Sequence, residues 1–218
     1  MLVRDTMTTN LITVSPHTSV PEALRLMRDK RIRRLPVLDS HGKLLGIVSD
    51  KDLLHAQPSQ ATTLSVWEIP ELLAKITVEQ VMSRDVVKVS EDTPLEEAAR
   101  IMADRRIGGL LVLRGDDLVG IITETDLFKE LLEMAGGRRP GVRITVRAAG
   151  GKGVLAKITG AISDAGGNIV GLGVSEIGEA AGGNHDWELM FKVQDAAQDQ
   201  LVAALKPVVE EVLDVRMS

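Results

Sequence analysis

The N-terminal part of this chain contains an internal duplication, which limits the folds it can adopt. Residues 3–38 align without a gap over residues 78–113, and 15 of the 36 aligned positions are identical. Chance would give only about two identities, so the segment is repeated. One residue is lost in the following turn, and the alignment then resumes at residues 46–53 and 120–127. Because each copy carries half a core, we expect the two copies to pack against each other about a pseudo-two-fold axis.

Each copy predicts the same order of elements: strand, helix, strand, strand, helix. Short strands are expected over residues 11–14 and 86–89. Apolar residues at helical spacing predict helices that begin near residues 20 and 95, with Thr18 and Thr93 as their N-caps. Two β-rich hairpins follow, over 32–48 and 107–122, and each leads through a polar turn into a second helix.

A unit of another kind follows the repeats. The stretch 135–141, rich in Gly and Arg, predicts a domain boundary. Beyond it, alternating and helical apolar spacings predict β-α-β-β-α-β, the ferredoxin-like order, with residues 178–186 as a loop. The fold class is therefore α/β (α+β). We expect repeat 1 over 1–56, a linker with a short helix over 57–76, repeat 2 over 77–135, a linker over 136–141 and the C-terminal domain over 142–218.

Composition and charge exclude several classes of function. The net charge of −5 argues against a general nucleic-acid binder, and the absence of cysteine excludes disulfides and thiolate chemistry. No apolar run reaches the ~20 residues of a membrane span, and the N-terminus has no signal pattern. We therefore expect a cytoplasmic protein that binds neither membrane nor nucleic acid. The four histidines are scattered, so neither a metal site nor a catalytic constellation is expected.

The turn that ends each hairpin is the best candidate for a functional site. Ser49-x-x-Asp52 and Thr123-x-x-Asp126 match the capping box that stabilises a helix N-terminus. The same turn also suits an anionic or hydroxyl-rich ligand, because helix N-termini attract anions and a carboxylate can accept from both hydroxyls of a ribose. The residues alone leave both interpretations open.

The duplicated block resembles a CBS pair, the cystathionine-β-synthase regulatory module. The family motif G-h-h-[S/T]-x-x-D stands here as Gly46–Asp52 and as Gly120–Asp126. The resemblance implies that the acid binds the ribose of an adenine nucleotide, and that the hydroxyl helps to hold ribose or phosphate. It also implies basic phosphate ligands before the second strand and an adenine between the first strands of the two copies. The nucleotide-binding residues expected on this basis are Ile12, Arg33, Arg34, Ser49, Lys51, Asp52, Val87, Gly108, Thr123, Thr125 and Asp126.

The two copies differ where the phosphate ligands are expected. The first copy has Arg33 and Arg34, whereas the second has Gly108 and Gly109. We therefore expect the cleft that uses Asp52 to prefer a phosphorylated nucleotide, because an arginine–phosphate contact is charge-assisted. The cleft that uses Thr123 and Asp126 is expected to bind weakly, or to take a less charged adenosine ligand.

The C-terminal unit resembles an ACT domain, a small module that often binds amino acids at a dimer interface. The residues that match its ligand site are Gly153, Val154, Leu155, Asn168 and Ile169. The acid of the family's D-x-P-G turn is absent from Gly150-Gly151-Lys152-Gly153. Both amino-acid binding and a purely dimerising role therefore stay open.

A CBS pair followed by an ACT domain resembles the bacterial AcuB-like acetoin-utilisation proteins. The resemblance implies a homodimeric, non-enzymatic regulator that binds AMP, ADP or ATP, uses no catalytic cofactor and modulates a metabolic enzyme partner. Two alternatives stay open: an enzyme or enzyme-regulatory subunit with chemistry in the loop near His185, and a sensor in which Asp50 and Asp52 hold Mg²⁺ beside the nucleotide.

Overall fold

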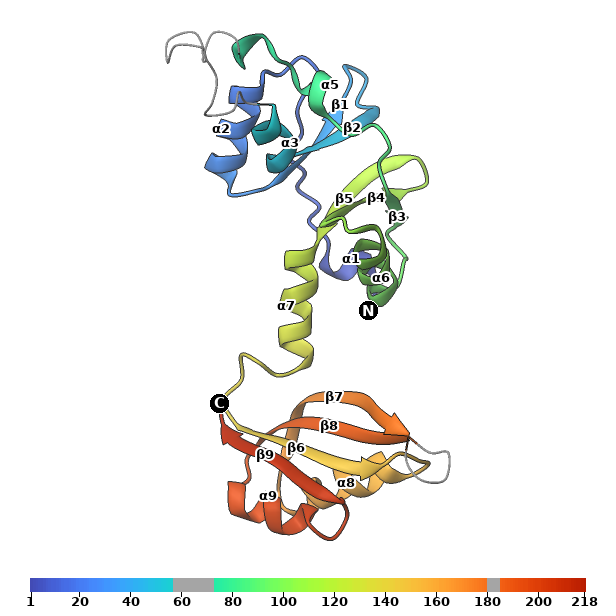
Figure 1. Cartoon of the computed structure of the whole chain (residues 1–218), viewed down its shortest axis with the longest axis vertical. Helices are drawn as coiled ribbons and strands as arrows, with labels where there is room; N and C mark the ends of the chain where they lie inside the picture. The colour runs from blue at the N-terminus through green and yellow to red at the C-terminus, as the bar shows by residue number, and fades with distance from the viewer. Residues whose placement is uncertain (57–72, 180–184) are drawn as a thin grey trace. The chain divides into compact units, whose positions relative to one another are not determined.

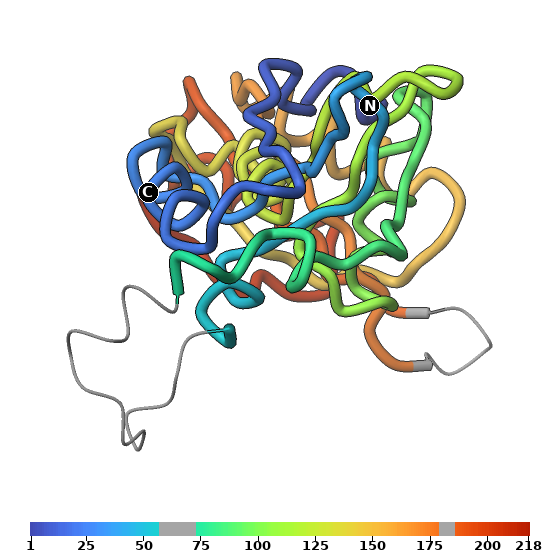
Figure 2. Tube along the Cα trace, turned by 90° about the horizontal axis from the view of Figure 1, so that it is seen from above, coloured from blue at the N-terminus to red at the C-terminus, as the bar shows by residue number. Residues whose placement is uncertain are grey.

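The computed structural model of the chain describes residues 1–56, 73–179 and 185–218, and these are coloured in Figures 1 and 2. The chain forms two compact units, Met1–Leu127 and Phe128–Ser218. The first unit holds the two repeats, and the second holds the C-terminal sheet. The division falls within helix α7 (Glu124–Met134).

Both repeats contain the helix, the hairpin and the second helix that the sequence predicts, and each also begins with a short helix that was not predicted. The first contains α1 (Val3–Thr6), α2 (Val20–Lys30), β1 (Arg34–Leu38), β2 (Leu44–Ser49) and α3 (Asp50–His55). The second contains α5 (Val78–Val81), β3 (Lys88–Ser90), α6 (Leu95–Arg105), β4 (Gly109–Arg114), β5 (Asp117–Thr123) and the start of α7. Strands β1 and β2 form an antiparallel hairpin, as do β4 and β5, and β3 lies parallel to β4.

Two further details of the repeats differ from the prediction. The strand expected over 11–14 is reduced to one parallel bridge between Val14 and Val37, and β3 begins only at Lys88. The N-caps lie one residue later than predicted, at Ser19 and Pro94, and neither makes a side-chain cap hydrogen bond. The linker expected over 57–76, with a short helix that includes Trp67, lies mostly outside the described residues.

The first residues of each repeat pack into the core of the other. Val3 is fully buried among residues of α6, β4 and β5, whereas Val78 and Met82 are buried among residues of α2, β1 and β2. In Figure 1, α1 accordingly lies beside α6, and α5 lies beside the β1–β2 hairpin. Backbone hydrogen bonds anchor both exchanged segments, between Thr8 and Ile121 and between Ser83 and Ile47. The exchange makes the two repeats one folding unit.

The exchanged segments explain why each motif begins with glycine. A Cβ on Gly46 would lie 2.7 Å from the carbonyl oxygen of Ser83, and a Cβ on Gly120 would lie 2.5 Å from Sδ of Met7. Real Cβ atoms essentially never come so close to another heavy atom. Glycine therefore allows the segment from the other repeat to reach the strand that leads into the motif turn.

The second unit has the predicted ferredoxin-like order. Its elements are β6 (Val142–Ala149), α8 (Val154–Asp164), β7 (Asn168–Glu179), β8 (His185–Gln194), α9 (Gln198–Leu205) and β9 (Glu211–Met217). The strands form an antiparallel sheet in the order β7-β8-β6-β9. Both helices cover one face of this sheet (Figure 1).

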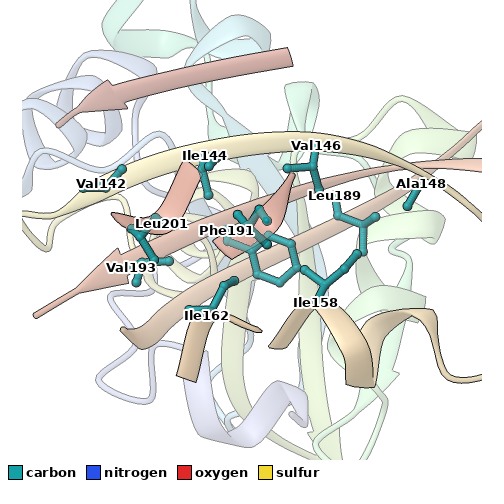
Figure 3. Close-up of a cluster of buried hydrophobic side chains, with 11 residues drawn as sticks. Val142, Ile144, Val146, Ala148, Ile158, Ile162, Leu189, Phe191, Val193 and Leu201 are labelled. Atoms are coloured by element: carbon teal, nitrogen blue, oxygen red, sulfur yellow. The ribbon is translucent and has the colours of Figure 1, made fainter. Parts of the chain in front are cut away.

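Alternating apolar residues along β6 and β8 form the core of the second unit. Every second residue of these strands faces the helices, and Ile144, Leu189 and Phe191 are fully buried there with Ile158 of α8 (Figure 3). The loop predicted over 178–186 is shorter than expected, because β7 continues to Glu179 and pairs with His185. Gly178, at a φ of +65°, and a register shift beside it let the strand continue past the point where its alternation ends.

Candidate functional site

A cleft of about 450 Å³ is lined by residues of both repeats. Its volume lies in the range of small-molecule sites. Ile47, Val86, Val87 and Ile107 supply its apolar lining. Its charged lining consists of four cations and four acids: Arg33, Arg34, Lys51 and Arg106, with Asp50, Asp52, Asp85 and Glu124. An apolar wall beside convergent charges suits a ligand with a flat apolar part and a polar or anionic part.

Ser49 and Asp52 form the capping box at the start of α3. The backbone N–H and the hydroxyl of Ser49 both donate to Oδ2 of Asp52, at 2.8 and 2.7 Å. In return, the Ser49 hydroxyl oxygen accepts from the Asp52 N–H at 3.3 Å. The capping interpretation of the motif is therefore confirmed. Since the cap uses Oδ2, Oδ1 of Asp52 has no hydrogen-bond partner among the described residues.

The second motif repeats this geometry at the start of α7. The Thr123 N–H and hydroxyl donate to Oδ2 of Asp126, at 3.0 and 2.7 Å. The Asp126 residue is only 9% exposed. Neither residue lines the cleft.

Arg34 crosses from the first repeat onto the second. Its guanidinium lies so close to Gly108 that a Cβ there would be 2.0 Å from Nη2, and the same Cβ would be 2.7 Å from Oε2 of Glu124. Burial lowers the pKa of the Arg34 guanidinium, while Glu124, followed by Asp50 and Asp52, acts in the opposite direction. Acids of both repeats therefore offset the positive charge of Arg34.

Arg33 also reaches toward the second repeat. Its Nη2 donates to Oγ1 of Thr125, at 3.4 Å. Arginine side chains of the first copy thus reach the surface where the second copy has Gly108 and Gly109 instead of arginines. The alignment alone does not reveal this contact.

The cleft brings together seven of the eleven predicted nucleotide-binding residues. These are Arg33, Arg34, Ser49, Lys51, Asp52, Val87 and Gly108. Thr123, Thr125 and Asp126 belong to the other motif, and Ile12 packs against the core of the first repeat. The predicted set therefore divides as two half-sites would, and only the half-site around Asp52 opens onto this cleft.

Sequence reasoning missed several lining residues, above all Arg106 and Glu124. A signal was present for both in the alignment. Arg106 aligns with Arg31, beside the basic run that includes Arg33, and Glu124 aligns with Asp50. The alignment therefore marks a charged position in both repeats at each of these two places, but not which copy lines the cleft.

A sequence profile of the CBS domain matches residues 3–59 and 78–133, together more than half of the chain. The chain belongs to the CBS domain family. A CBS domain-containing protein of Dictyostelium discoideum is 33% identical over 135 residues, which span 62% of this chain and 93% of that relative. The two repeats are therefore CBS domains, and the cleft lies within a CBS pair.

Two solved CBS structures resemble the first unit. The structure of CBSX2 in complex with AMP is 35% identical, with a TM-score of 0.51, and covers 61% of this chain and 97% of its own. The structure of an acetoin utilization protein (AcuB) from Vibrio cholerae is also 35% identical, with a TM-score of 0.52, and covers 63% and 96%. CBS pairs similar to this one thus include a structure with a bound adenine nucleotide.

Beyond the CBS pair, the residues predicted for an ACT ligand site lie in two places. Gly153, at a φ of +82°, precedes α8, and Val154 and Leu155 pack against the core. Asn168 and Ile169 open β7, and Ile169 is paired with Val193. Because β6 ends near Gly153 whereas Val193 pairs with the start of β6, the two groups lie at opposite ends of the sheet. A single copy of this unit does not bring them together.

The described part of the chain offers neither a metal cluster nor a membrane-spanning helix. It contains no group of three or more His, Asp or Glu side chains that could hold a metal ion, although Asp50 and Asp52 both line the cleft. No helix in residues 1–56, 73–179 or 185–218 is long and apolar enough to cross a membrane. The loop proposed for chemistry near His185 lies largely outside the described residues.

Proposed function

We propose that the cleft of this CBS pair binds an adenine nucleotide as a regulatory ligand. One observation carries the proposal: the capping acid Asp52, the guanidinium of Arg34 and the apolar surface of Val87 line one cleft of about 450 Å³, although they come from different repeats. These groups match the three parts of a nucleotide, which are the ribose, the phosphate and the base.

The ribose is assigned to Asp52. Its Oδ2 atom is engaged by Ser49, whereas Oδ1 can accept a ribose hydroxyl. The cap holds the carboxylate in place before the ligand arrives, so binding orders no additional side chain at this point.

The base and the phosphate are assigned to the remaining lining. Val87, Val86 and Ile47 offer an apolar surface for a flat adenine ring. Arg33 and Arg34 are placed to receive the phosphate, because guanidinium groups form charge-assisted hydrogen bonds with phosphate oxygens. The AMP in the similar CBSX2 structure supports this class of ligand.

The role of the ligand is to regulate rather than to react. The cleft is lined by both repeats, so a ligand that prefers one arrangement of the repeats shifts the population toward it. The partner is proposed to be a metabolic enzyme, and the similarity to AcuB supports acetoin utilisation as one candidate process. The second unit is proposed to be an ACT-like module that dimerises two chains or senses a second small ligand, across residues 142–218.

Isothermal titration with AMP, ADP, ATP, adenosine and S-adenosylmethionine tests the nucleotide proposal. The informative variant is Asp52→Asn, because asparagine keeps an acceptor for the Ser49 cap but loses the carboxylate charge. The matched control is Asp126→Asn, since Asp126 makes the same cap bonds in the other motif but does not line the cleft.

We expect saturable binding of at least AMP by the unmodified protein. Losing a hydrogen bond to a charged group weakens binding about 10- to 100-fold, so Asp52→Asn is expected to fall in that range. Asp126→Asn should remain within about twofold of the unmodified protein. No binding of any of the five compounds, or equal binding by the two variants, would refute the proposed site.

A further inference from the structure

Two arginines hold a backbone conformation that normally belongs to glycine. Arg31 ends α2 with φ and ψ of 53° and 41°, and Arg106 ends α6 with 54° and 41°. Each residue donates its backbone N–H to two carbonyl oxygens of its helix, so both are equivalent helix caps. Left-handed geometry crowds a Cβ atom, and glycine is the usual residue at this position. Because glycine would fit both positions without strain, we looked to the side chains for a role of the two arginines.

A helix cap alone explains both arginines equally. A cation near the C-terminus of a helix interacts favourably with the helix dipole, and this holds for Arg31 and Arg106 alike. The surroundings of the two side chains, however, are different. Arg106 lines the same cleft as Asp52, whereas Arg31 does not line it.

Arg106 also differs from the other two arginines of the cleft in the contacts of its side chain. It is exposed, and its side chain makes no hydrogen bond or ion pair with any residue that the structure describes. Arg34, in contrast, lies beside Glu124, and Arg33 donates to Thr125. An incoming phosphate thus meets one arginine that acids already offset, one that is partly engaged, and Arg106.

We propose that Arg106, contributed by the second repeat, binds the phosphate of the ligand in the cleft that uses Asp52. The inference rests on the proposed nucleotide site and adds a residue that the family motif does not contain. Binding then connects the two repeats through the ligand, with the ribose held by the first repeat and the phosphate held in part by the second. Arg106 thereby sets a preference for phosphorylated over unphosphorylated adenosine ligands.

The left-handed backbone gives an unusually clean test. Arg106→Gly removes the side chain, and glycine fits the cap geometry without strain, so the end of the helix is preserved. Arg31→Gly makes the same change at the equivalent cap, outside the cleft, and is the matched control. Arg106→Lys keeps the positive charge without the planar guanidinium. For each protein, the dissociation constants of AMP and adenosine are measured by isothermal titration in the same buffer.

Arg106→Gly is expected to weaken AMP binding roughly tenfold, the usual effect of losing a charge-assisted contact, and to change adenosine binding by less than about twofold. Arg31→Gly should leave both constants unchanged, and Arg106→Lys should fall between the unmodified protein and Arg106→Gly. Melting temperatures of the two glycine variants should agree within about 2 °C, because their backbones change alike. The ratio of the AMP constant to the adenosine constant within each protein is independent of any difference in folded fraction.

The same measurements distinguish a failure of the nucleotide site from a failure of the role of Arg106. If the unmodified protein binds AMP and Arg106→Gly retains the same ratio of AMP to adenosine affinity, the role of Arg106 is wrong and the nucleotide site stands. If Arg31→Gly lowers the ratio of AMP to adenosine affinity as much as Arg106→Gly does, the role of Arg106 is also wrong, because the loss of any nearby positive charge would then explain the effect. If the unmodified protein binds neither compound, both the site and the role of Arg106 are wrong.

Discussion

The guanidinium of Arg34 occupies the space in which a side chain at Gly108 would begin. A Cβ on Gly108 would lie 2.0 Å from Nη2 of Arg34, far inside van der Waals contact. In the aligned repeats, Gly108 corresponds to Arg33, so one copy supplies arginines where the other supplies room for them. The two copies have therefore diverged in a complementary way, and arginine side chains of the first copy lie against the second copy.

Gly108→Ala is expected to displace Arg34 from its position in the cleft. The atoms that the new methyl group meets are the flexible ends of Arg34 and Glu124, so the fold adjusts with a cost of ~1 kcal/mol or less. AMP affinity should fall about tenfold, because the arginine no longer reaches the phosphate. Gly151→Ala is the control, since a Cβ at Gly151 meets nothing within 4 Å. Unchanged AMP binding by Gly108→Ala would contradict this role of Arg34.

The glycines that open the two motifs should differ in their tolerance of alanine. A Cβ at Gly46 would meet a backbone oxygen, that of Ser83, at 2.7 Å, whereas at Gly120 the closest atom is the flexible Sδ of Met7. Overpacking against backbone costs ~1–3 kcal/mol, and a methionine side chain can move aside at lower cost. Denaturant unfolding should therefore show a larger loss of stability for Gly46→Ala than for Gly120→Ala. Equal losses would mean that the exchanged segments are not held as described.

The sequence predicted the fold well because its signals were periodic. The repeat identified two copies of one unit, and alternation at Leu189, Phe191 and Val193 identified the strand at the centre of the C-terminal core. The exchange of the leading segments could not be predicted. Met7 and Met82 occupy the same aligned position, and the neighbouring sequence does not indicate which repeat's core each methionine joins. The caps were misplaced by one residue at Ser19 and Pro94, since turn residues cluster there.

Only the part of the site that lies within one short segment was predicted. The motif identified Ser49 and Asp52, which come from one short segment. The sequence could not tell that Arg106, rather than its aligned partner Arg31, lines this cleft, because that difference arises only when the two repeats pack together. Glu124 was missed because its role depends on the path of Arg34 across Gly108.

The two phenylalanines of the chain offer a test of the C-terminal core. Phe191 is fully buried in a cluster made only of residues from the second unit, whereas Phe128 is 64% exposed. Phe191→Ala should destabilise that unit by ~3–5 kcal/mol through loss of burial and creation of a cavity. Phe128→Ala, the control, should change stability by only about 0.5 kcal/mol. Calorimetry together with AMP titration checks both points, and loss of AMP binding in folded Phe191→Ala would contradict the assignment of the cleft to the first unit alone.

The acid titration of Asp214 should report its arginine partners. The side-chain hydrogen bond from Arg216, with the nearby Arg143, holds the pKa of Asp214 below its ordinary value. Because the folded pKa is depressed, the stabilising contribution is fully present above the unfolded pKa of about 3.9 and is lost as the pH falls through the folded pKa. Carboxyl carbon NMR should give a midpoint below ~3.9, and Arg216→Ala should raise it. A midpoint that Arg216→Ala does not move would show that the pair is not formed in solution.

A crystal structure of the protein grown with saturating AMP shows whether the cleft is the nucleotide site. We expect one nucleotide in the cleft between the repeats, with the ribose hydroxyls at the carboxylate of Asp52, the adenine against Val87 and the phosphate within hydrogen-bond distance of Arg34 and Arg106. An AMP molecule bound elsewhere, or an empty cleft at saturating AMP, would contradict it.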